Sequence, residues 1–124
     1  MYSITVRDHI LIAHSLRKEV FGPAQNVHGA TYIVDVEFIT STLNEDSIVI
    51  DIGVAKEILK TILADIDYQN LDEHPHFKEI LSTTEIIAKY IHDGIRQKVS
   101  GSFDGRLKVT LGESHIAWAS YTED

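Results

Sequence analysis

Two histidines stand where they could do chemistry together. His14 follows a stretch in which apolar and polar residues alternate, and His28 precedes a second such stretch. If the two stretches pair as antiparallel strands, the imidazoles meet at one end of the pair, and two imidazoles are half of a zinc site. The other interpretation, which the spacing alone favours, is two polar residues that close a sheet.

A glutamate near the end of the chain is the second candidate. Glu113 continues the alternation of Leu107, Val109 and Leu111, so its carboxylate should point toward the face that these residues bury. A carboxylate there needs a partner or a ligand. The ring N–H and exocyclic amine of a purine or a pterin could supply a bidentate partner. The alternative is a strand-end glutamate in solvent.

Two further segments carry candidate side chains on weaker grounds. Ser82 and Glu85 have the spacing of a capping box, which predicts the start of a helix more readily than a binding site. Asp67 is followed by Tyr68, and a carboxylate beside a phenol could take part in proton transfer. Dipeptides of this kind are common by chance, so this pair carries little weight alone.

The elements that must position these residues follow the order ββααββ. Period-2 alternation predicts four strands, at residues 2–13, 30–40, 107–111 and 116–121. Apolar residues spaced three and four apart predict two helices, over 52–66 after an N-cap at Asp51 and over 86–95. Residues 15–29 read as a loop. This order predicts an α+β fold, an antiparallel four-stranded sheet with two helices on one face. Its open edges favour closure into a barrel by oligomerisation.

Composition narrows the classes of function. The chain has 124 residues, 44% of them hydrophobic, and a formal net charge of −8, which suits one domain over residues 1–124. The acidic balance argues against a nucleic-acid partner. With no cysteine, disulfides, thiolate metal sites and a cysteine nucleophile are excluded. No segment reads as a membrane helix or a targeting signal, so we expect no membrane partner and a cytoplasmic location.

Six short segments occur in an order that covers nearly the whole chain: Ile12–Leu16, Val27–Tyr32, Ile48–Asp51, Ile66–Leu71, Ser82–Glu85 and Leu111–Ser114. Together they resemble the motifs of the 6-pyruvoyl- and 6-carboxytetrahydropterin synthase family. The resemblance implies the tunnelling fold, a ββααββ subunit usually assembled as a hexamer, with pterin sites between subunits. We therefore expect a homo-oligomer.

The family's reactive groups are only partly present. The resemblance implies three zinc-binding histidines, the last two as His-x-His. His14 and His28 match, but the third position is Ala30. The family's catalytic cysteine falls at Ala24, and the histidine of its "LDH" motif falls at Tyr68. A tyrosine with the ordinary pKa of about 10 is a poor base at neutral pH. Zinc is therefore a doubtful cofactor.

The ring-anchoring groups persist by the same comparison. Glu113 matches the family's closing glutamate, Thr83 and Thr84 match its threonine motif, and Asp67 matches one member of its proton-transfer pair. The leading hypothesis is a protein that binds a pterin or purine-like ring without the normal synthase reaction.

Two alternatives remain open. In the first, an active metal-dependent lyase uses His14 and His28 on a metal, with Asp67 or Tyr68 as acid or base on a dihydroneopterin-type substrate. In the second, the chain is a catalytically dead structural subunit of a larger assembly.

Overall fold

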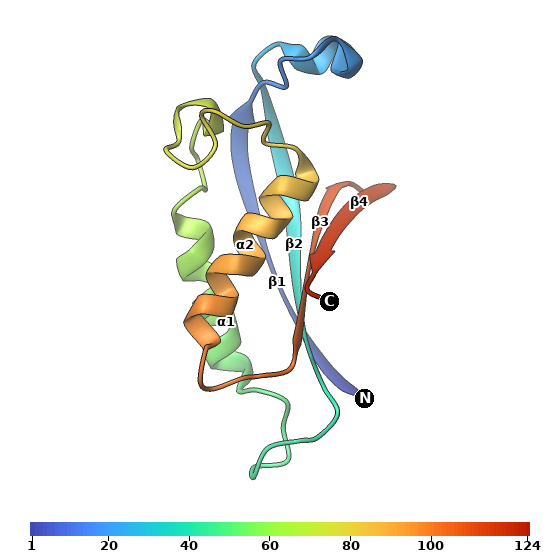
Figure 1. The fold of residues 1–124 in the computed structure, drawn as a ribbon, viewed down its shortest axis with the longest axis vertical. Helices are drawn as coiled ribbons and strands as arrows, with labels where there is room; N and C mark the ends of the chain where they lie inside the picture. The colour runs from blue at the N-terminus through green and yellow to red at the C-terminus, as the bar shows by residue number, and fades with distance from the viewer.

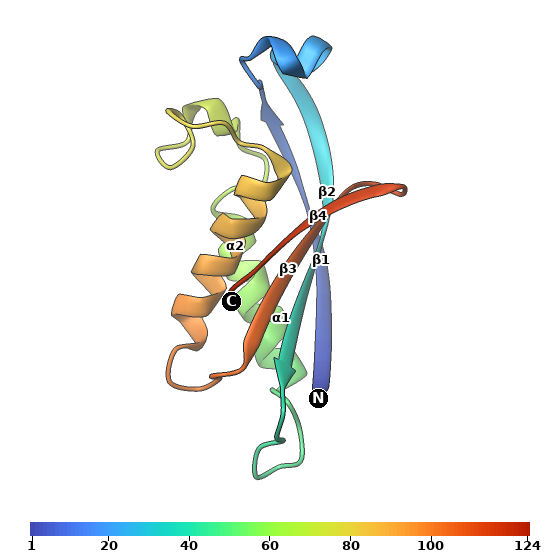
Figure 2. The same cartoon turned by 45° about the vertical axis from the view of Figure 1, so that its right-hand side comes forward.

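Two long antiparallel strands and a shorter hairpin form one sheet covered by two helices. The computed structural model describes residues 1–124, and its strand order is β1-β2-β3-β4. The elements run β1 (Tyr2–His14), η1 (Glu19–Gln25), β2 (His28–Thr40), α1 (Ile52–Ala64), η2 (Leu71–Glu73), α2 (Thr84–Val99), β3 (Arg106–Ser114) and β4 (Ala117–Thr122). Both helices lie on the same face of the sheet (Figures 1 and 2). The predicted α+β fold is confirmed.

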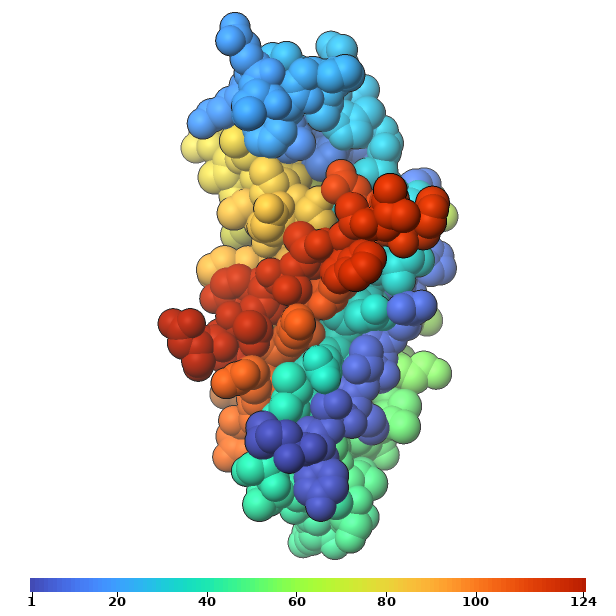
Figure 3. All heavy atoms as spheres, turned by 90° about the vertical axis from the view of Figure 1, so that its right-hand side faces the viewer, coloured from blue at the N-terminus to red at the C-terminus, as the bar shows by residue number.

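The opposite face of the sheet carries no helix and is turned toward the viewer in Figure 3. No helix is both long and apolar enough to span a membrane. Most of the predicted boundaries shift by one to four residues. The second strand begins at His28 rather than at residue 30, and the expected loop over 15–29 contains the short helix η1. The pairing with β1 explains the earlier start, because it continues to the last residue of that strand.

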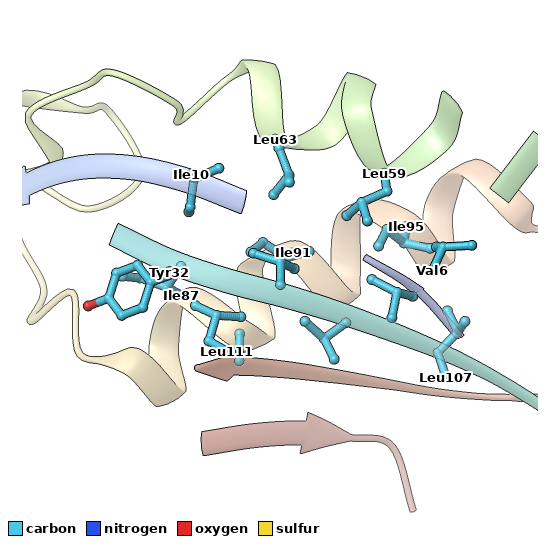
Figure 4. Packing of buried hydrophobic residues seen from close by; sticks show 14 of the residues in the cluster. Val6, Ile10, Tyr32, Leu59, Leu63, Ile87, Ile91, Ile95, Leu107 and Leu111 are labelled. Atoms are coloured by element: carbon cyan, nitrogen blue, oxygen red, sulfur yellow. The ribbon is translucent and has the colours of Figure 1, made fainter. Parts of the chain in front are cut away.

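The core fills the space between the sheet and the helices. Inward residues of β2 such as Tyr32 and Val34 pack with Ile10 of β1, Leu111 of β3 and the helix residue Ile91, and all five are essentially buried. Figure 4 shows the helix side chains meeting the strand side chains across this layer, with the phenol oxygen of Tyr32 pointing out at one end of the cluster. Burial of apolar surface of this kind is the main contribution to folding free energy.

The helix starts explain one wrong prediction. Asp51 is the N-cap of α1, as expected, and its carboxylate accepts a hydrogen bond from Val54 N at 2.9 Å. At α2, however, the cap is Thr83, whose hydroxyl accepts from Ile86 N at 3.3 Å. The capping box predicted at Ser82 and Glu85 is therefore wrong by one residue. Ser82 has another partner, which belongs to the candidate site.

The C-terminal end of β4 is fastened to α2 by one carboxylate. Glu123 accepts hydrogen bonds from Arg96 Nη2 at 2.8 Å and from Leu107 N at 2.6 Å, and it also contacts the buried His92 ring. Burial alone would raise the pKa of Glu123. The hydrogen bonds from Leu107, His92 and Arg96 outweigh burial, so the pKa lies below its usual value of 4.5.

Replacing this carboxylate tests its contribution to stability. We expect Glu123→Gln to lower the free energy of unfolding at neutral pH by about 1–3 kcal/mol, because charge-assisted hydrogen bonds are lost. A carboxyl group whose pKa is lower in the folded state stabilises the fold at pH values above its unfolded-state pKa of 4.5. This stabilisation is lost as the pH falls through the folded-state pKa. Urea unfolding at pH 7 and pH 3 should therefore show a difference that shrinks in acid.

The matched control is Glu57→Gln, at an exposed carboxylate of α1 that makes no ion pair in the structure. This variant should unfold like the parent protein. An equal loss at both pH values for Glu123→Gln would contradict an electrostatic role.

Candidate functional site

The two candidate histidines meet at the end of the sheet that carries η1 and the start of α2. His14 is the last residue of β1, His28 is the first of β2, and the two are register partners. Their ring centroids lie 4.6 Å apart with an interplanar angle of 63°. Both occupy positions in the helix-facing phase of their strands, so the antiparallel register brings the rings together.

Each imidazole is oriented through its Nδ1 atom. His14 Nδ1 lies 2.9 Å from the carbonyl oxygen of Ser82 and donates to it. His28 Nδ1 lies 2.7 Å from the carbonyl oxygen of Asn26 and donates in the same way. A neutral imidazole that donates through Nδ1 keeps its lone pair on Nε2. Both rings are therefore held with Nε2 available as an acceptor or as a ligand.

The surroundings of His14 displace its pKa. Burial, and then the neighbouring His28 charge, lower the pKa of His14 below 6.5, although its bond to Ser82 and the charges of Asp72 and Glu113 oppose the shift. His14 is consequently neutral at neutral pH, and its Nδ1–H still donates to the Ser82 carbonyl in that state.

A buried phenol joins the histidine end of the sheet to the start of α2. Tyr32 is essentially buried, and burial raises its pKa, while a hydrogen bond with the Thr84 side chain opposes the rise. The charge of Glu113 acts on Tyr32 and on His14 as well. The structure therefore gathers His14, Thr84 and Glu113 around one end of the core. Thr83, the cap of α2, is the residue next to Thr84.

Glu113 makes no hydrogen bond or ion pair, in contrast to Asp67 and Asp72. Asp67 accepts from Leu11 N at 2.9 Å, and Asp72 accepts from Ser15 N at 3.1 Å and from Ser15 Oγ at 2.6 Å. Glu113 is exposed, at the end of β3. The expectation that it continues the buried face is wrong, because a register irregularity between Gly112 and Ser114 interrupts the alternation there.

Asp67 and Tyr68 lie along the β1 edge of the sheet, away from Glu113. Their segment runs along the outer edge of β1, where Tyr68 N donates to Leu11 O at 2.7 Å. Tyr68 has a positive φ of 60° and is 79% exposed. Strands β1 and β2 separate this edge from β3, which carries Glu113. Within one subunit the structure does not bring Asp67 and Tyr68 together with Glu113.

The residues present do not fit a three-ligand zinc site. His14 and His28 supply two nitrogens, but no group of three histidine, cysteine, aspartate or glutamate side chains is arranged to hold a metal ion. The family's third position is Ala30, and the nearby Asp72 carboxylate is already bonded to Ser15. Zinc at a protein site normally needs at least three protein ligands.

Of two residues that shape this end of the molecule, Tyr32 was not singled out from the sequence and Ser82 was interpreted mainly as a helix cap. Ser82 resembled a helix cap, and Tyr32 resembled an ordinary core residue of β2. The one available signal is the run Ser82-Thr83-Thr84, in which a single hydroxyl caps the helix and leaves the others free.

The tautomer and titration of His14 can be tested directly. Imidazole nitrogen NMR at neutral pH should show His14 protonated on Nδ1, with a pKa below 6.5. His28→Gln should raise that pKa, because a positive neighbour is removed. Because the pKa of His14 is lower in the folded state, the fold is most stable at pH values above the unfolded-state pKa of 6.5. Its stability decreases as the pH falls through the folded-state pKa of His14. Ser82→Ala keeps the carbonyl acceptor, so it should leave the tautomer unchanged. An Nε2-protonated ring would contradict the assignment.

Comparison with known proteins identifies the family to which this chain is similar. A family described as 6-pyruvoyl tetrahydropterin synthase matches residues 3–124. The 6-carboxy-5,6,7,8-tetrahydropterin synthase of Bacillus subtilis is 30% identical over 92 residues, covering 71% of this chain and 61% of that protein, which is less than two thirds of its length. The 6-pyruvoyl tetrahydrobiopterin synthase of Poecilia reticulata is 30% identical over 113 residues, covering 83% of this chain and 77% of that one.

Solved structures give the same result at the level of the fold. The 6-pyruvoyl tetrahydropterin synthase of Caenorhabditis elegans superposes with a TM-score of 0.86 at 25% identity, over 99% of this chain and 96% of the other. The Plasmodium vivax enzyme superposes with a TM-score of 0.79 at 18% identity, over 99% and 98% of the two chains. With the family match over almost its full length, the chain belongs to the 6-pyruvoyl tetrahydropterin synthase family.

Proposed function

We propose that this protein binds a pterin or purine-like ring and does not run the normal synthase reaction. The observation that carries the proposal is the Glu113 carboxylate, which has no protein partner and whose charge acts on His14 and on Tyr32 at the end of the sheet where α2 starts. A carboxylate without a protein partner suits a ring edge that presents an N–H and an amine.

The threonines suit the same ligand. Thr83 accepts from Ile86 N through its hydroxyl oxygen, and a hydroxyl that accepts still has its proton to donate. Thr84 is held by Tyr32 at the buried side. In the proposed complex Glu113 takes the donor edge of the ring, and Thr83 or Thr84 adds a further hydrogen bond.

We infer loss of the synthase reaction because the residues at the reactive positions cannot bind a metal or transfer a proton as the reaction requires. Proton transfer next to a carbon–oxygen group needs a positioned base of suitable pKa. Methyl groups stand at Ala24 and Ala30, and neither can bind a metal or move a proton. Asp67 is engaged by Leu11 N, which leaves its second oxygen as the only candidate base of that segment.

A homo-oligomer is part of the proposal. Strands β1 and β4 are the outer strands of the sheet, and apart from the contact of residues 67–70 with β1 their outer edges have no partner. Unpaired edges favour pairing with another chain. Joining the β4 edge of one copy to the β1 edge of the next would bring Asp67 and Tyr68 toward the Glu113 of the neighbour. A hexamer is the expected size.

Glu113→Ala tests ring binding. Isothermal titration with neopterin should give a dissociation constant at least tenfold weaker for the variant, because a charge-assisted bidentate contact contributes about 1.5–3 kcal/mol. Glu85→Ala, at an exposed glutamate of α2, is the control and should bind like the parent protein. Equal or absent binding in parent and Glu113→Ala would contradict the proposal and favour a purely structural subunit. Sedimentation of the same samples as a monomer would contradict the assembly.

The second candidate is a metal-dependent lyase, favoured by two adjacent imidazoles whose Nδ1 atoms are both bonded to carbonyl oxygens, which leaves both Nε2 atoms available. It requires a third zinc donor from another copy or from the substrate. We expect purified protein, soaked in zinc and desalted, to retain almost none. Ala30→His should retain close to one ion per chain, because residue 30 shares the strand face of His28 and is the register partner of Ile12, two residues before His14.

Ala30→Leu is the matched control, with added bulk and no donor atom. Stoichiometric zinc in the parent protein, lost on His28→Ala, would reverse the order of the two candidates. In that event consumption of dihydroneopterin triphosphate would become the decisive assay.

A further inference from the structure

A buried histidine of α2, which the proposed function does not use, lies between two carboxylates. Only 4% of the side chain of His92 is exposed. Its Nδ1 atom lies 3.0 Å from Asp93 Oδ1, and its Nε2 atom contacts Oε2 of Glu123, the residue that follows β4. The end of the chain consequently lies beside α2 (Figure 2). Both nitrogens of one buried ring therefore face carboxylate oxygens.

Each of these two oxygens has the imidazole ring as its hydrogen-bond partner. Glu123 accepts from Arg96 and from Leu107 N through its other oxygen, Oε1. Asp93 accepts from Lys89 at 2.7 Å, again through its other oxygen, Oδ2. An ionised carboxylate has lone pairs but no proton, so it cannot donate to the ring. Hydrogen bonds at both ring nitrogens therefore need a proton on each nitrogen.

Both carboxylates are held in the charged state. Burial alone would raise the pKa of Asp93, but the hydrogen bonds from Lys89 and His92 outweigh burial and hold that pKa below its usual value of 3.8. The pKa of Glu123 is lowered for the same reason, with His92 again among the donors. A neutral imidazole has one N–H and one lone pair, so it would turn that lone pair toward one of the two anions.

The other groups around the ring come from three elements. The titratable side chains belong to α2 and to the end of β4, and they are Lys89, Asp93, Arg96, Tyr121 and Glu123. Strand β3 contributes the backbone N–H of Leu107, which donates to Glu123. The Tyr121 ring meets the His92 ring edge-on, with centroids 4.7 Å apart. Lys89 is half exposed, whereas the imidazole is enclosed by these groups.

We propose that His92 is held as an imidazolium and that its charge fastens the end of β4 to α2. Loss of one proton leaves a single N–H, which can serve Glu123 or Asp93 but not both. Asp93 is 53% exposed and can turn to water, so the neutral ring keeps Glu123. A neutral hydrogen bond is roughly half as strong as a charge-assisted one. The end of β4 is therefore held more firmly while the ring is charged, and it loosens as the ring loses its proton.

This contact also bears on assembly. Strand β4 is an outer strand of the sheet, and its edge is one of the two through which the proposed homo-oligomer would form. A loosely held strand presents a less regular edge to a neighbouring copy. This consequence rests on the proposed function, whereas the charge of His92 and its effect on β4 do not. We expect the oligomer to dissociate at a higher protein concentration at pH 8.5 than at pH 6.

Nitrogen NMR of the imidazoles tests the charge of His92 without a substitution. At pH 6 both ring N–H protons of His92 should give resonances that are protected from exchange with water, because both are hydrogen-bonded within the protein. The ring protons of His115, which is exposed in the β3–β4 hairpin, should exchange rapidly. A His92 ring with one proton at pH 6 would overturn the proposal.

Amide hydrogen exchange tests how firmly β4 is held. After correction for the intrinsic effect of pH, the β4 amides should open roughly five- to tenfold more at pH 8.5 than at pH 6, relative to the amides of α1, since a charged hydrogen bond becomes a neutral one. His92→Gln offers a neutral donor at both pH values, so its β4 should open at pH 6 as the parent protein does at pH 8.5. His115→Gln, which also removes a histidine, is the matched control and should keep the pH dependence.

The outcomes separate this inference from the proposed assembly. Exchange of β4 that is equal at the two pH values in the parent protein, or unchanged by His92→Gln, overturns the role of His92. Loosening of β4 as expected, with sedimentation of a monomer at both pH values, overturns the assembly and leaves the role of His92 standing. An oligomer whose dissociation does not follow β4 exchange overturns only the link between the two.

Discussion

The register between β1 and β2 is the constraint on which the candidate site depends. It pairs thirteen residues without interruption, from Tyr2 with Thr40 to His14 with His28. A slip of one residue would move every inward side chain to the other face and expose the core. Because the apolar residues of both strands fix this register, the same burial that stabilises the fold also sets one imidazole against the other.

The polar side chains near the His14–His28 end of the sheet fall into two sets, those with a protein partner and those without one. His14, Asp67 and Asp72 have protein partners, and these contacts hold the turn segments against β1. Glu113 has none, and it stands where the regular alternation of β3 breaks. An unpaired carboxylate at an irregular strand end is a group that a ligand can use without displacing a structural hydrogen bond.

The sequence and the structure agree on the helices and strands that periodicity predicted, whereas at Glu113 a register irregularity interrupts the predicted alternation. The spacing of apolar residues predicted the two helices and the four strands, and Asp51 was correctly read as a cap because its contact reaches only three residues along the chain. The prediction failed at Ser82, where two adjacent hydroxyls could cap α2 equally well. The nearby ring of His14 binds Ser82, and Thr83 becomes the cap.

The amino-acid sequence by itself therefore determined the element order, the inward faces and the meeting of His14 with His28, because strand alternation and helix periodicity are local properties of the chain. Its motifs also indicated the family. Only the tertiary structure decided that Asp67 and Asp72 are bonded to β1 and its following segment, and that the alternation of β3 breaks at Glu113. Those features depend on contacts between strands that lie far apart in the sequence, and no local pattern contains them.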